Sequence, residues 1–249
     1  MTKKSTTLVV SEAEMRIMGS LLEWIRRPYR EWLNSKSNLV SSEFADAFSM
    51  RLRAFHALHG PDEALTKKAF EYAFAEAAQA AGRNATVVRS STVAGSDVIM
   101  DKKGISLKTE ADRNIRPGHI TISKLMESAW TKECATLEDF RVGIGFHIAP
   151  RLRHSSRMFT LRAFGRLSDR GAIRYELVEI PMRLLFAMER AVVTDFGLIT
   201  KARGTKVQIT HNGKPAFKLV FDGSDQKITI RDLDRNLCIV HGEWTLSAK

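Results

Sequence analysis

The hydrophobic residues of this chain change their spacing near residue 86, and this change constrains the fold more than any other feature. Before it, apolar residues recur every three to four positions, as on one face of an α-helix. After it, they alternate in short runs separated by turn residues, as in β-strands. The order predicts a helical N-terminal part followed by a part built around a sheet.

Three helices are predicted in the first part. Ser11 and Glu14 have the spacing of a capping box, which predicts a helix that ends before Pro28. A second helix is predicted from about Ser42 to His59. A third is predicted to open at Asp62 and to end at Gly82, since glycine suits the left-handed conformation after a helix.

Strands are predicted in most of the remaining chain. The strand-like segments are 86–89, 97–101, 105–110, 158–167, 172–180 and most of the last fifty residues. Short helices are expected at Ile122 to Trp130 and after Pro181. No linker rich in Gly, Ser or Pro divides the chain. We therefore expect one α/β (α+β) domain over 1–249, with 1–82 mainly helical and 83–249 forming a mixed sheet core.

The charge of the chain suggests its partner. The sequence has 39 Lys and Arg against 28 Asp and Glu, a net charge of +11, and 44% hydrophobic residues, enough for a packed core. An excess of cations favours nucleic acid, although it is also compatible with a charge that only keeps the protein soluble. Two cysteines form no disulfide framework, and no apolar run is long enough for a signal peptide or a membrane span. We expect a cytoplasmic protein.

The hairpin from Asp97 to Lys108 is the segment with the clearest chemistry. Asp97 begins its first strand and lies opposite the end of the second, where Lys108 stands. Ser106 and Lys108 share one face because strand side chains alternate, and Glu110 shares that face if the strand continues. A carboxylate with a backbone carbonyl can hold Mg²⁺, and a nearby lysine can stabilise or help deprotonate an attacking water. Alone, the pattern is also that of a solvated surface hairpin.

Glu71 is a further candidate in the third helix. It stands between Phe70 and Phe74, so it either faces the hairpin and completes a metal site or is an exposed helix glutamate. Only the fold decides between these alternatives.

Six groups of residues follow one another from about residue 60 to the C-terminus in a recognisable order. They are Ala64–Lys67 with Phe70–Glu71 and Ala73–Phe74, Leu107–Ala111, Ser123–Lys124 with Met126–Glu127, Phe159–Arg162, Leu177–Pro181, and Cys238–Gly242 with Trp244. In these segments the chain resembles the SmaI family of type II restriction endonucleases, and its hairpin resembles the PD-(D/E)xK nuclease core. The helices before residue 60 match poorly.

The resemblance implies a restriction-endonuclease-like fold, with a mixed sheet flanked by helices. It also implies a Mg²⁺-dependent endonuclease that works as a homodimer on double-stranded DNA. The implied site is a palindrome of the CCCGGG type cut to blunt ends.

The same resemblance assigns roles to the hairpin residues. Asp97 is the implied metal carboxylate, Lys108 the catalytic lysine, and the backbone carbonyl of Leu107 a further metal ligand. Where the general nuclease pattern has an acidic residue, this chain has Ser106. The second carboxylate is therefore open between Glu71 and Glu110.

DNA recognition is assigned to cations downstream of the hairpin. Arginine matches the two acceptors of guanine, so a G·C-rich site points to Arg157 and Arg162 as base readers, with a phosphate clamp or an exposed strand face as the alternative. His241 either approaches DNA or is an ordinary core or surface histidine. The residues expected at phosphates are Arg113, Asn114, Arg116, His119 and Lys124.

Two other functions remain open from the sequence. Ser106 is compatible with a DNA-binding protein whose nuclease core has lost its metal site. A repair or recombination nuclease that recognises DNA structure is the other alternative. It is disfavoured by an arginine-rich stretch that brackets a predicted strand and comprises Arg151, Arg153, Arg157, Arg162 and Arg166. Near the N-terminus, Met15, Met18 and Trp24 are expected to pack between the first helices or to form a dimer surface.

Overall fold

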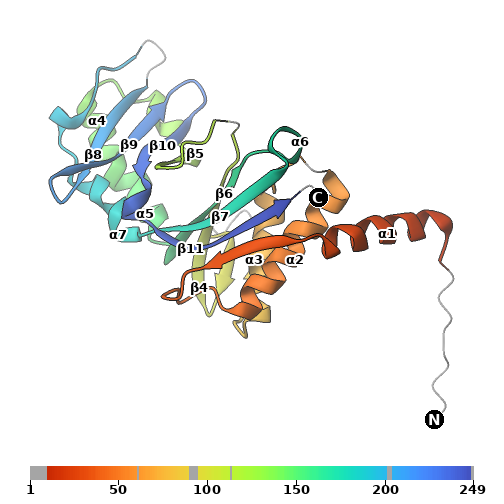
Figure 1. The fold of residues 1–249 in the computed structure, drawn as a ribbon. Coiled ribbons are helices and arrows are strands. Elements are labelled where there is room, and N and C mark those ends of the chain that lie inside the picture. The colour runs from red at the N-terminus through yellow and green to blue at the C-terminus, as the bar shows by residue number, and fades with distance from the viewer. Residues whose placement is uncertain (1–9, 61, 90–94, 113, 201–203, 248–249) are drawn as a thin grey trace.

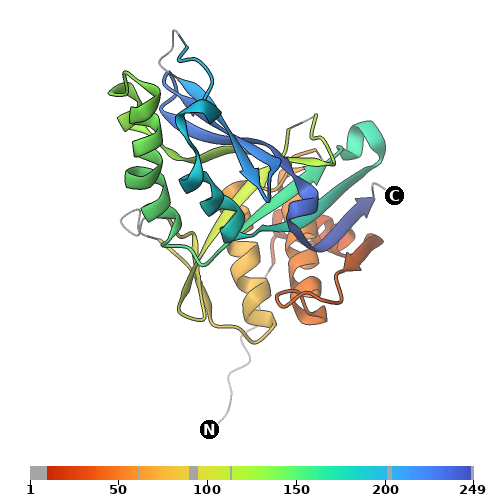
Figure 2. The ribbon, with the colours of Figure 1, turned by 90° about the vertical axis from the view of Figure 1, so that its left-hand side faces the viewer.

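The computed structural model describes residues 10–60, 62–89, 95–112, 114–200 and 204–247 of the 249-residue chain. In this part of the chain, a seven-stranded and a four-stranded sheet lie next to each other, and the larger one carries two long helices on one face (Figures 1 and 2). The mixed helix and strand content confirms the predicted α+β class. No helix within the described ranges is long and apolar enough to cross a membrane.

The three long helices are α1 (Glu12–Arg26), α2 (Ser42–His59) and α3 (Lys67–Ala80). The first two confirm the prediction, including the capping box in which Ser11 and Glu14 bond each other's backbone N–H. The predicted start of the third helix is wrong. Thr66 is its N-cap, and the N–H of Leu65 donates to the Tyr175 hydroxyl at 3.1 Å, which fixes the preceding segment outside the helix.

The seven-stranded sheet has the order β1-β11-β7-β6-β4-β3-β2. Its strands are β1 (Tyr29–Leu33), β2 (Ala85–Val87), β3 (Val98–Met100), β4 (Lys103–Glu110), β6 (Arg157–Phe164), β7 (Ala172–Ile180) and β11 (Ile239–Ser247). The pairing of β4 with β6 is parallel and the others are antiparallel. Strand β1 was not predicted. It joins the N-terminal segment to the C-terminal strand at the sheet edge.

The four-stranded sheet is antiparallel and has the order β5-β10-β9-β8. Its strands are β5 (His119–Glu127), β8 (Thr205–His211), β9 (Lys214–Asp222) and β10 (Lys227–Asp234). The helix predicted at Ile122 to Trp130 is wrong, because most of this segment is β5. Ile122 pairs with Ile230 and Met126 with Ile228, so β5 bulges between them. The bulge puts buried Ile122 and Leu125 three positions apart, which imitates a helical period.

Short helices connect these strands. They are α4 (Leu137–Gly143), α5 (Ala149–Leu152), α6 (Leu167–Arg170) and α7 (Met182–Leu185), with single 3₁₀ turns and a π turn at Ile144–Ile148 between some of them. The helix expected after Pro181 is present, and α6 replaces the simple turn expected between β6 and β7.

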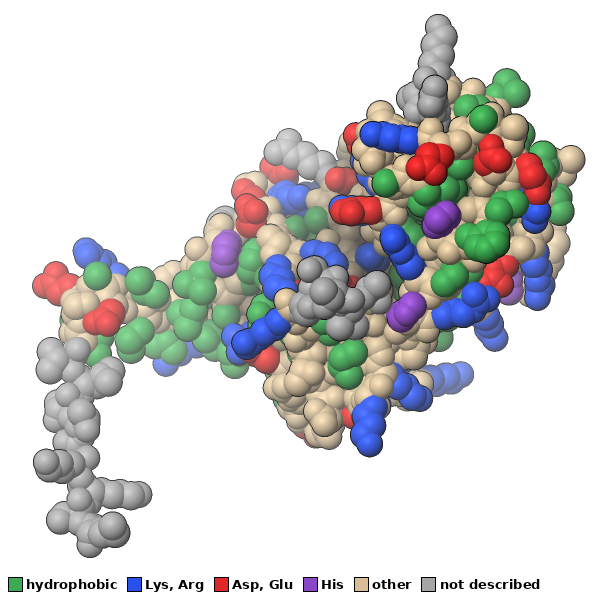
Figure 3. All heavy atoms as spheres, turned by 180° about the vertical axis from the view of Figure 1, so that it is seen from behind, with side chains coloured by type: hydrophobic (Ala, Val, Ile, Leu, Met, Phe, Trp, Pro, Cys, Tyr) green, Lys and Arg blue, Asp and Glu red, His purple; other side chains and the backbone are tan. Residues whose placement is uncertain are grey.

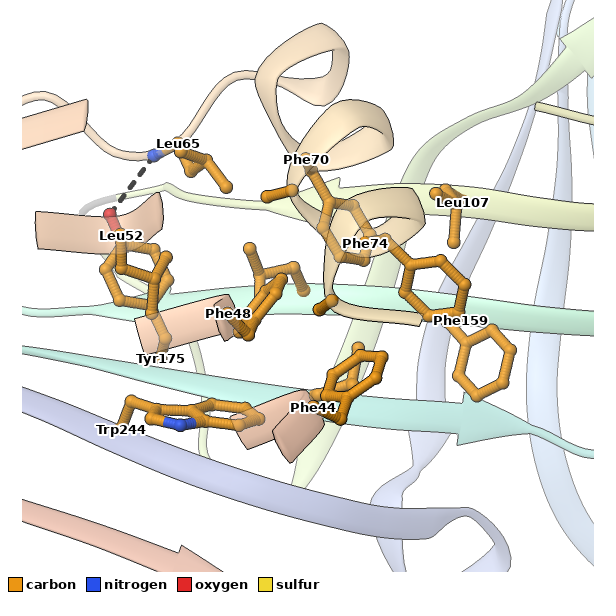
Figure 4. Packing of buried hydrophobic residues seen from close by; sticks show 14 of the residues in the cluster. Phe44, Phe48, Leu52, Leu65, Phe70, Phe74, Leu107, Phe159, Tyr175 and Trp244 are labelled. Atoms are coloured by element: carbon orange, nitrogen blue, oxygen red, sulfur yellow. Dashed lines mark hydrogen bonds between the residues drawn. The ribbon is translucent and has the colours of Figure 1, made fainter. Parts of the chain in front are cut away.

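Among the residues that the structure describes, two hydrophobic clusters hold the fold together. The first lies between α2, α3 and the larger sheet, where Phe44, Phe48, Phe74, Phe159 and Trp244 pack ring against ring (Figure 4). The second fills the space around the smaller sheet and the short helices.

Strand β6 contributes to both clusters because its side chains alternate between the faces. Phe159 and Leu161 belong to the first cluster, and Met158 to the second. The face of β4 that carries Ser106 and Lys108 is therefore turned toward the smaller sheet, away from the core under α2 and α3.

Candidate active site

A cleft of about 780 Å³ lies where the two sheets meet. Its walls come from the start of α3, the segment before β3, the free face of β4, strand β5 and the region of α5. Lys and Arg side chains border the hollow between the two parts of the molecule (Figure 3). The cleft residues used below are Lys67, Lys68, Glu71, Asp97, Ser106, Lys108, Lys124 and Arg151.

Asp97 is held in the cleft by the neighbouring strand. Its Oδ2 accepts a hydrogen bond from the backbone N–H of Leu107 at 2.7 Å, and the Ser106 hydroxyl lies 3.5 Å from the same oxygen. The other oxygen, Oδ1, remains directed at the side chains of α3. A strand residue presents its N–H and C=O to the same side, so the Leu107 carbonyl lies on the same edge of β4 as Asp97.

Glu71 and Asp97 are distant in sequence, but both form ion pairs with the ammonium group of Lys67. The Lys67 ammonium lies 2.7 Å from Asp97 Oδ1 and 3.6 Å from Glu71 Oε1. Lys68 binds the other oxygen of Glu71 at 2.8 Å. The Glu71 side chain is only 8% exposed, so α3 holds it against the sheet instead of leaving it in solvent.

Lys108 completes the cluster from β4. Its Nζ donates to the backbone carbonyl of Leu125 at 3.1 Å, which fixes the ammonium between β4 and β5. Burial lowers its pKa to about 8, with Asp97 opposing this shift and the positive Lys67 adding to it. A lysine with such a pKa gains and loses its proton near neutral to mildly alkaline pH.

The cleft residues fit a magnesium ion without forming a complete protein cage. Glu71 and Asp97 offer carboxylate oxygens, and the Leu107 carbonyl lies on the adjacent strand edge. In the ranges that the structure describes, no group of three or more His, Cys, Asp or Glu forms a metal cluster. One or two carboxylates with waters and substrate phosphates are the ligands that Mg²⁺ ordinarily takes in enzymes.

Glu110 lies outside this cleft. Its Oε2 is 2.6 Å from Arg162 Nε, and its Oε1 accepts the N–H of Thr121 at 2.9 Å. Burial raises the pKa of Glu110, while Arg162 counteracts the shift. Of the two candidates for the second carboxylate, the structure brings only Glu71 next to Asp97.

Comparisons with known proteins bear on what this cleft does. The sequence model of the SmaI family, described as type II site-specific deoxyribonuclease, matches residues 4–246. The chain belongs to the SmaI family of type II site-specific deoxyribonucleases. It is 31% identical over 237 residues to the type II restriction enzyme SmaI of Serratia marcescens, covering 92% of this chain and 91% of that protein. No solved structure matches. The resemblance to the SmaI family seen in the sequence is thereby confirmed.

Arg162 of this SmaI-family deoxyribonuclease is not available for DNA contacts. Its side chain is 0% exposed and binds the carboxylates of Glu110 and Glu176 at 2.6 and 2.9 Å. The remaining donors bind the backbone carbonyls of Arg116, Pro117 and His119. The expected base-reading role is corrected to a structural one. The sequence pattern placed Arg162 on a strand face, but it did not show that the segment leading into β5 covers that face.

Arg157 and His241 meet at Glu179 instead of entering the cleft. Arg157 Nε lies 2.9 Å from Glu179 Oε1 and its Nη2 lies 2.9 Å from Asn38 Oδ1. His241 is 2% exposed, with Nε2 at 2.8 Å from Glu179 Oε2 and Nδ1 at 2.7 Å from Ser37 Oγ. Burial would raise the pKa of Glu179, but these partners lower it to about 2. The expectation that His241 contacts DNA is therefore corrected, since the structure gives it core partners.

In the structure of this SmaI-family enzyme, the residues expected to bind phosphates lie in different places. Arg113 lies outside the described residues. Asn114 lines a separate pocket of about 590 Å³, and Arg116 pairs with Asp232. Of the described members of this set, only Lys124 lines the cleft, where it is exposed and lies 2.8 Å from Glu127.

Sequence reasoning missed Lys67, Lys68 and Arg151 as residues of the site. Lys67 and Lys68 precede Glu71 by four and three positions, a spacing that places them on the same side of a helix. That pattern was readable, but it becomes informative only when Asp97 is known to lie beside it. Arg151 was noted only as part of an arginine-rich stretch, and the fold places it on the cleft wall.

Proposed function

We propose that this enzyme hydrolyses phosphodiester bonds of double-stranded DNA in the cleft between α3, β4 and β5, with Mg²⁺ as cofactor. The observation that carries the proposal is the convergence of Glu71 and Asp97 on one cation position, beside the buried Lys108. The family membership supports the substrate class.

The side chains of the cleft have distinct roles in this proposal. When bound, Mg²⁺ supplies positive charge that stabilises the charge developing on the phosphate in the transition state. Asp97 and Glu71 hold the cation, and the Leu107 N–H keeps the Asp97 carboxylate in its orientation. The Lys108 ammonium, held by Leu125, stabilises negative charge at the reacting phosphate, and its neutral form can accept a proton from the attacking water.

The hairpin departs from the nuclease pattern at Ser106, and Glu71 compensates for it in this account. A serine supplies no negative charge, so a site with Asp97 alone would favour the alternative of a DNA-binding protein without cleavage. Glu71 provides the second carboxylate from α3. This position favours a working hydrolytic site over a degenerate one.

DNA recognition is the less constrained part of the proposal. Lys124 and Arg151 line the cleft, and we assign them to the phosphates. Arg157 lies outside the cleft lining, so its role as a base reader rests on the match between arginine and guanine and on the G·C-rich site that the resemblance implies. From that resemblance we propose a CCCGGG-type palindrome, cut to blunt ends by a homodimer in the cytoplasm.

The test uses the whole protein and linear duplexes with one CCCGGG sequence or a scrambled one. We expect two discrete fragments from the first duplex with Mg²⁺, none with EDTA, and none from the scrambled duplex. Ligation to blunt-ended and overhang adaptors identifies the ends.

Asp97→Ala is the control variant. It should bind the duplex but leave it uncut. Sequence-specific binding by the wild type without cleavage in any divalent metal would favour the non-cleaving alternative. Cleavage of branched DNA with little sequence preference would favour a repair nuclease.

A further inference from the structure

Helix α1 leaves most of its apolar side uncovered by its own chain. Residues 11–20 are all exposed, and the helix projects from the body of the molecule with hydrophobic side chains along it (Figures 1 and 3). Met15, Ile17, Met18 and Leu22 are 46–58% exposed. A cluster of this kind on a helix marks a contact surface more often than an ordinary solvent face.

The projecting part is nevertheless a well-defined helix with a fixed direction. Its C-terminal half is anchored on α2, because Trp24 stacks on His56 and Arg53 donates to the carbonyl of Ile25. Its N-terminus has the capping box of Ser11 and Glu14. Short helices without tertiary packing are only marginally stable in water, so this segment needs a partner.

The charges beside the apolar side indicate which partner fits. Glu12, Arg16, Glu23 and Arg26 follow at helical spacing along one flank of Met15 and Leu22. Among the described residues, Glu12, Arg16 and Arg26 have no ion-pair partner, and only Glu23 has one, Arg27 at 2.8 Å. Glu12, Arg16 and Arg26 are therefore free for charges of another molecule, and the exposed Glu23 can exchange its partner Arg27 for such a charge.

Along the helix these four charges alternate between negative and positive. A second copy of the helix running in the opposite direction therefore presents a positive charge to each negative one. If two copies of α1 pack antiparallel about Gly19, Glu12 of each copy faces Arg26 of the other, and Arg16 lies within one position of facing Glu23. A parallel pair would place like charges opposite each other. The exposed Gly19 falls at the crossing point, where an added Cβ would meet no atom of its own chain within 4 Å. A mid-helix glycine costs about 1 kcal/mol relative to alanine, and a close helix crossing accounts for that cost.

We propose that α1 pairs antiparallel with α1 of a second copy of this chain, across a two-fold axis near Gly19. This inference rests on the proposed homodimer and specifies its interface. Such a pair is isologous, as a palindromic DNA site requires of the protein. A pair of 15-residue helices buries less area than a standard interface of about 1,600 Å², so we expect a dissociation constant on the order of 1 µM without DNA.

Sedimentation equilibrium of the whole protein, without DNA or Mg²⁺, tests the proposal. Met18→Lys should weaken self-association by at least about tenfold, because it brings like charges together at the two-fold axis. The matched control is Met50→Lys on α2, where the methionine is 42% exposed. Glu12→Arg should also weaken the dimer, and the double variant Glu12→Arg with Arg26→Glu should restore it.

Cross-linking gives a second readout that does not depend on affinity. Gly19→Cys should form a disulfide-linked dimer under mild oxidation, whereas Ser20→Cys, turned to another side of the helix, should not. A dimer of wild-type affinity in Met18→Lys, with equal cross-linking at both positions, would overturn this interface and leave the homodimer standing. A wild type that stays monomeric at all concentrations and on DNA would overturn the interface and the homodimer together. The cleavage assay judges hydrolysis separately.

Discussion

At the scale of single residues, the chemistry of the cleft depends on which acidic and basic groups the fold brings together. Asp97 and Lys108 belong to one hairpin, and their proximity follows from strand geometry. Glu71 joins them from helix α3, 26 positions before Asp97 in the sequence. Glu110 shares the strand with Lys108, yet it lies outside the cleft, where Arg162 binds it.

Replacing Lys108 tests the role of its ammonium. Lys108→Met should lower the single-turnover cleavage rate by about 10² to 10⁴, the range for losing a general acid–base group. DNA binding should change little. The control is Lys124→Met, which removes an exposed cation from the same cleft and should mainly weaken binding. Equal effects of both changes on the cleavage step would argue against a catalytic role for Lys108.

At the scale of helices and strands, the pattern of neighbouring residues predicted some elements correctly and others wrongly. The first two helices were predicted because their end signals are local: Ser11 and Glu14 form the cap of α1, and Gly60 ends α2. Strand β5 was mistaken for a helix because a bulge broke its alternation, and the bulge depends on pairing with β10 about a hundred residues later. The start of α3 was missed because Tyr175, far along the chain, fixes Leu65.

The residues of the candidate site also divide into those that the local sequence predicts and those that depend on the fold. The hairpin residues Asp97 and Lys108 were predictable, since their relation is local. The choice of Glu71 over Glu110 was not, because it depends on how α3 packs on the sheet. The burial of Arg162 was also out of reach, since the segment covering it had been assigned to the DNA-binding surface.

The cluster around Glu179 joins strands β6, β7 and β11, and it predicts a pH dependence of stability. The pKa of Glu179 is lowered from 4.5 to about 2, so its carboxylate stabilises the fold above pH 4.5. This contribution is lost as the pH falls from 4.5 toward 2. Glu179→Gln should cost roughly 2 kcal/mol of unfolding free energy at pH 7, allowing for solvent screening, and less as the pH falls through this window.

Denaturant unfolding of both proteins at several pH values measures this difference. Glu138→Gln, which removes an exposed ion pair with Arg141, is the control and should change stability little. A difference between wild type and Glu179→Gln that stays constant from pH 7 to pH 3 would contradict the assigned pKa.

At the scale of the whole molecule, the two sheets are expected to behave as one domain. Strands β6 and β7 contribute side chains to both hydrophobic clusters, with Phe159 and Leu177 in the first and Met158, Val178 and Ile180 in the second. If β6 and β7 unfolded from one cluster, the apolar side chains of the other cluster would also be exposed to water. The cleft lies at this shared boundary, so its geometry depends on both sheets.

One cooperative unfolding transition should therefore be observed. Trp244 lies in the first cluster and Trp130 packs against the second. Variants in which Trp244 or Trp130 is the single tryptophan, with Trp24 and Trp32 also replaced, should give coincident fluorescence transitions in urea, matching the transition seen by circular dichroism. Two separate midpoints would show that the sheets form two domains.

The net charge of +11 also gains a more specific meaning at this scale. Cations line the cleft, but the site itself is built around two acidic groups, Glu71 and Asp97. A phosphate is attracted to the surrounding cations and repelled by these carboxylates. The proposed Mg²⁺, bound between the two carboxylates, would remove this repulsion.

The most direct test of this central claim compares Glu71→Gln with Glu110→Gln. Single-turnover cleavage of a duplex with one CCCGGG sequence is measured in Mg²⁺, after circular dichroism has shown the folded fraction of each variant. We predict a rate loss of about a thousandfold or more for Glu71→Gln, since a lost metal carboxylate costs several kcal/mol of transition-state stabilisation. Folded Glu110→Gln should cut near the wild-type rate. Wild-type cleavage by Glu71→Gln, with loss of cleavage in folded Glu110→Gln, would contradict the account.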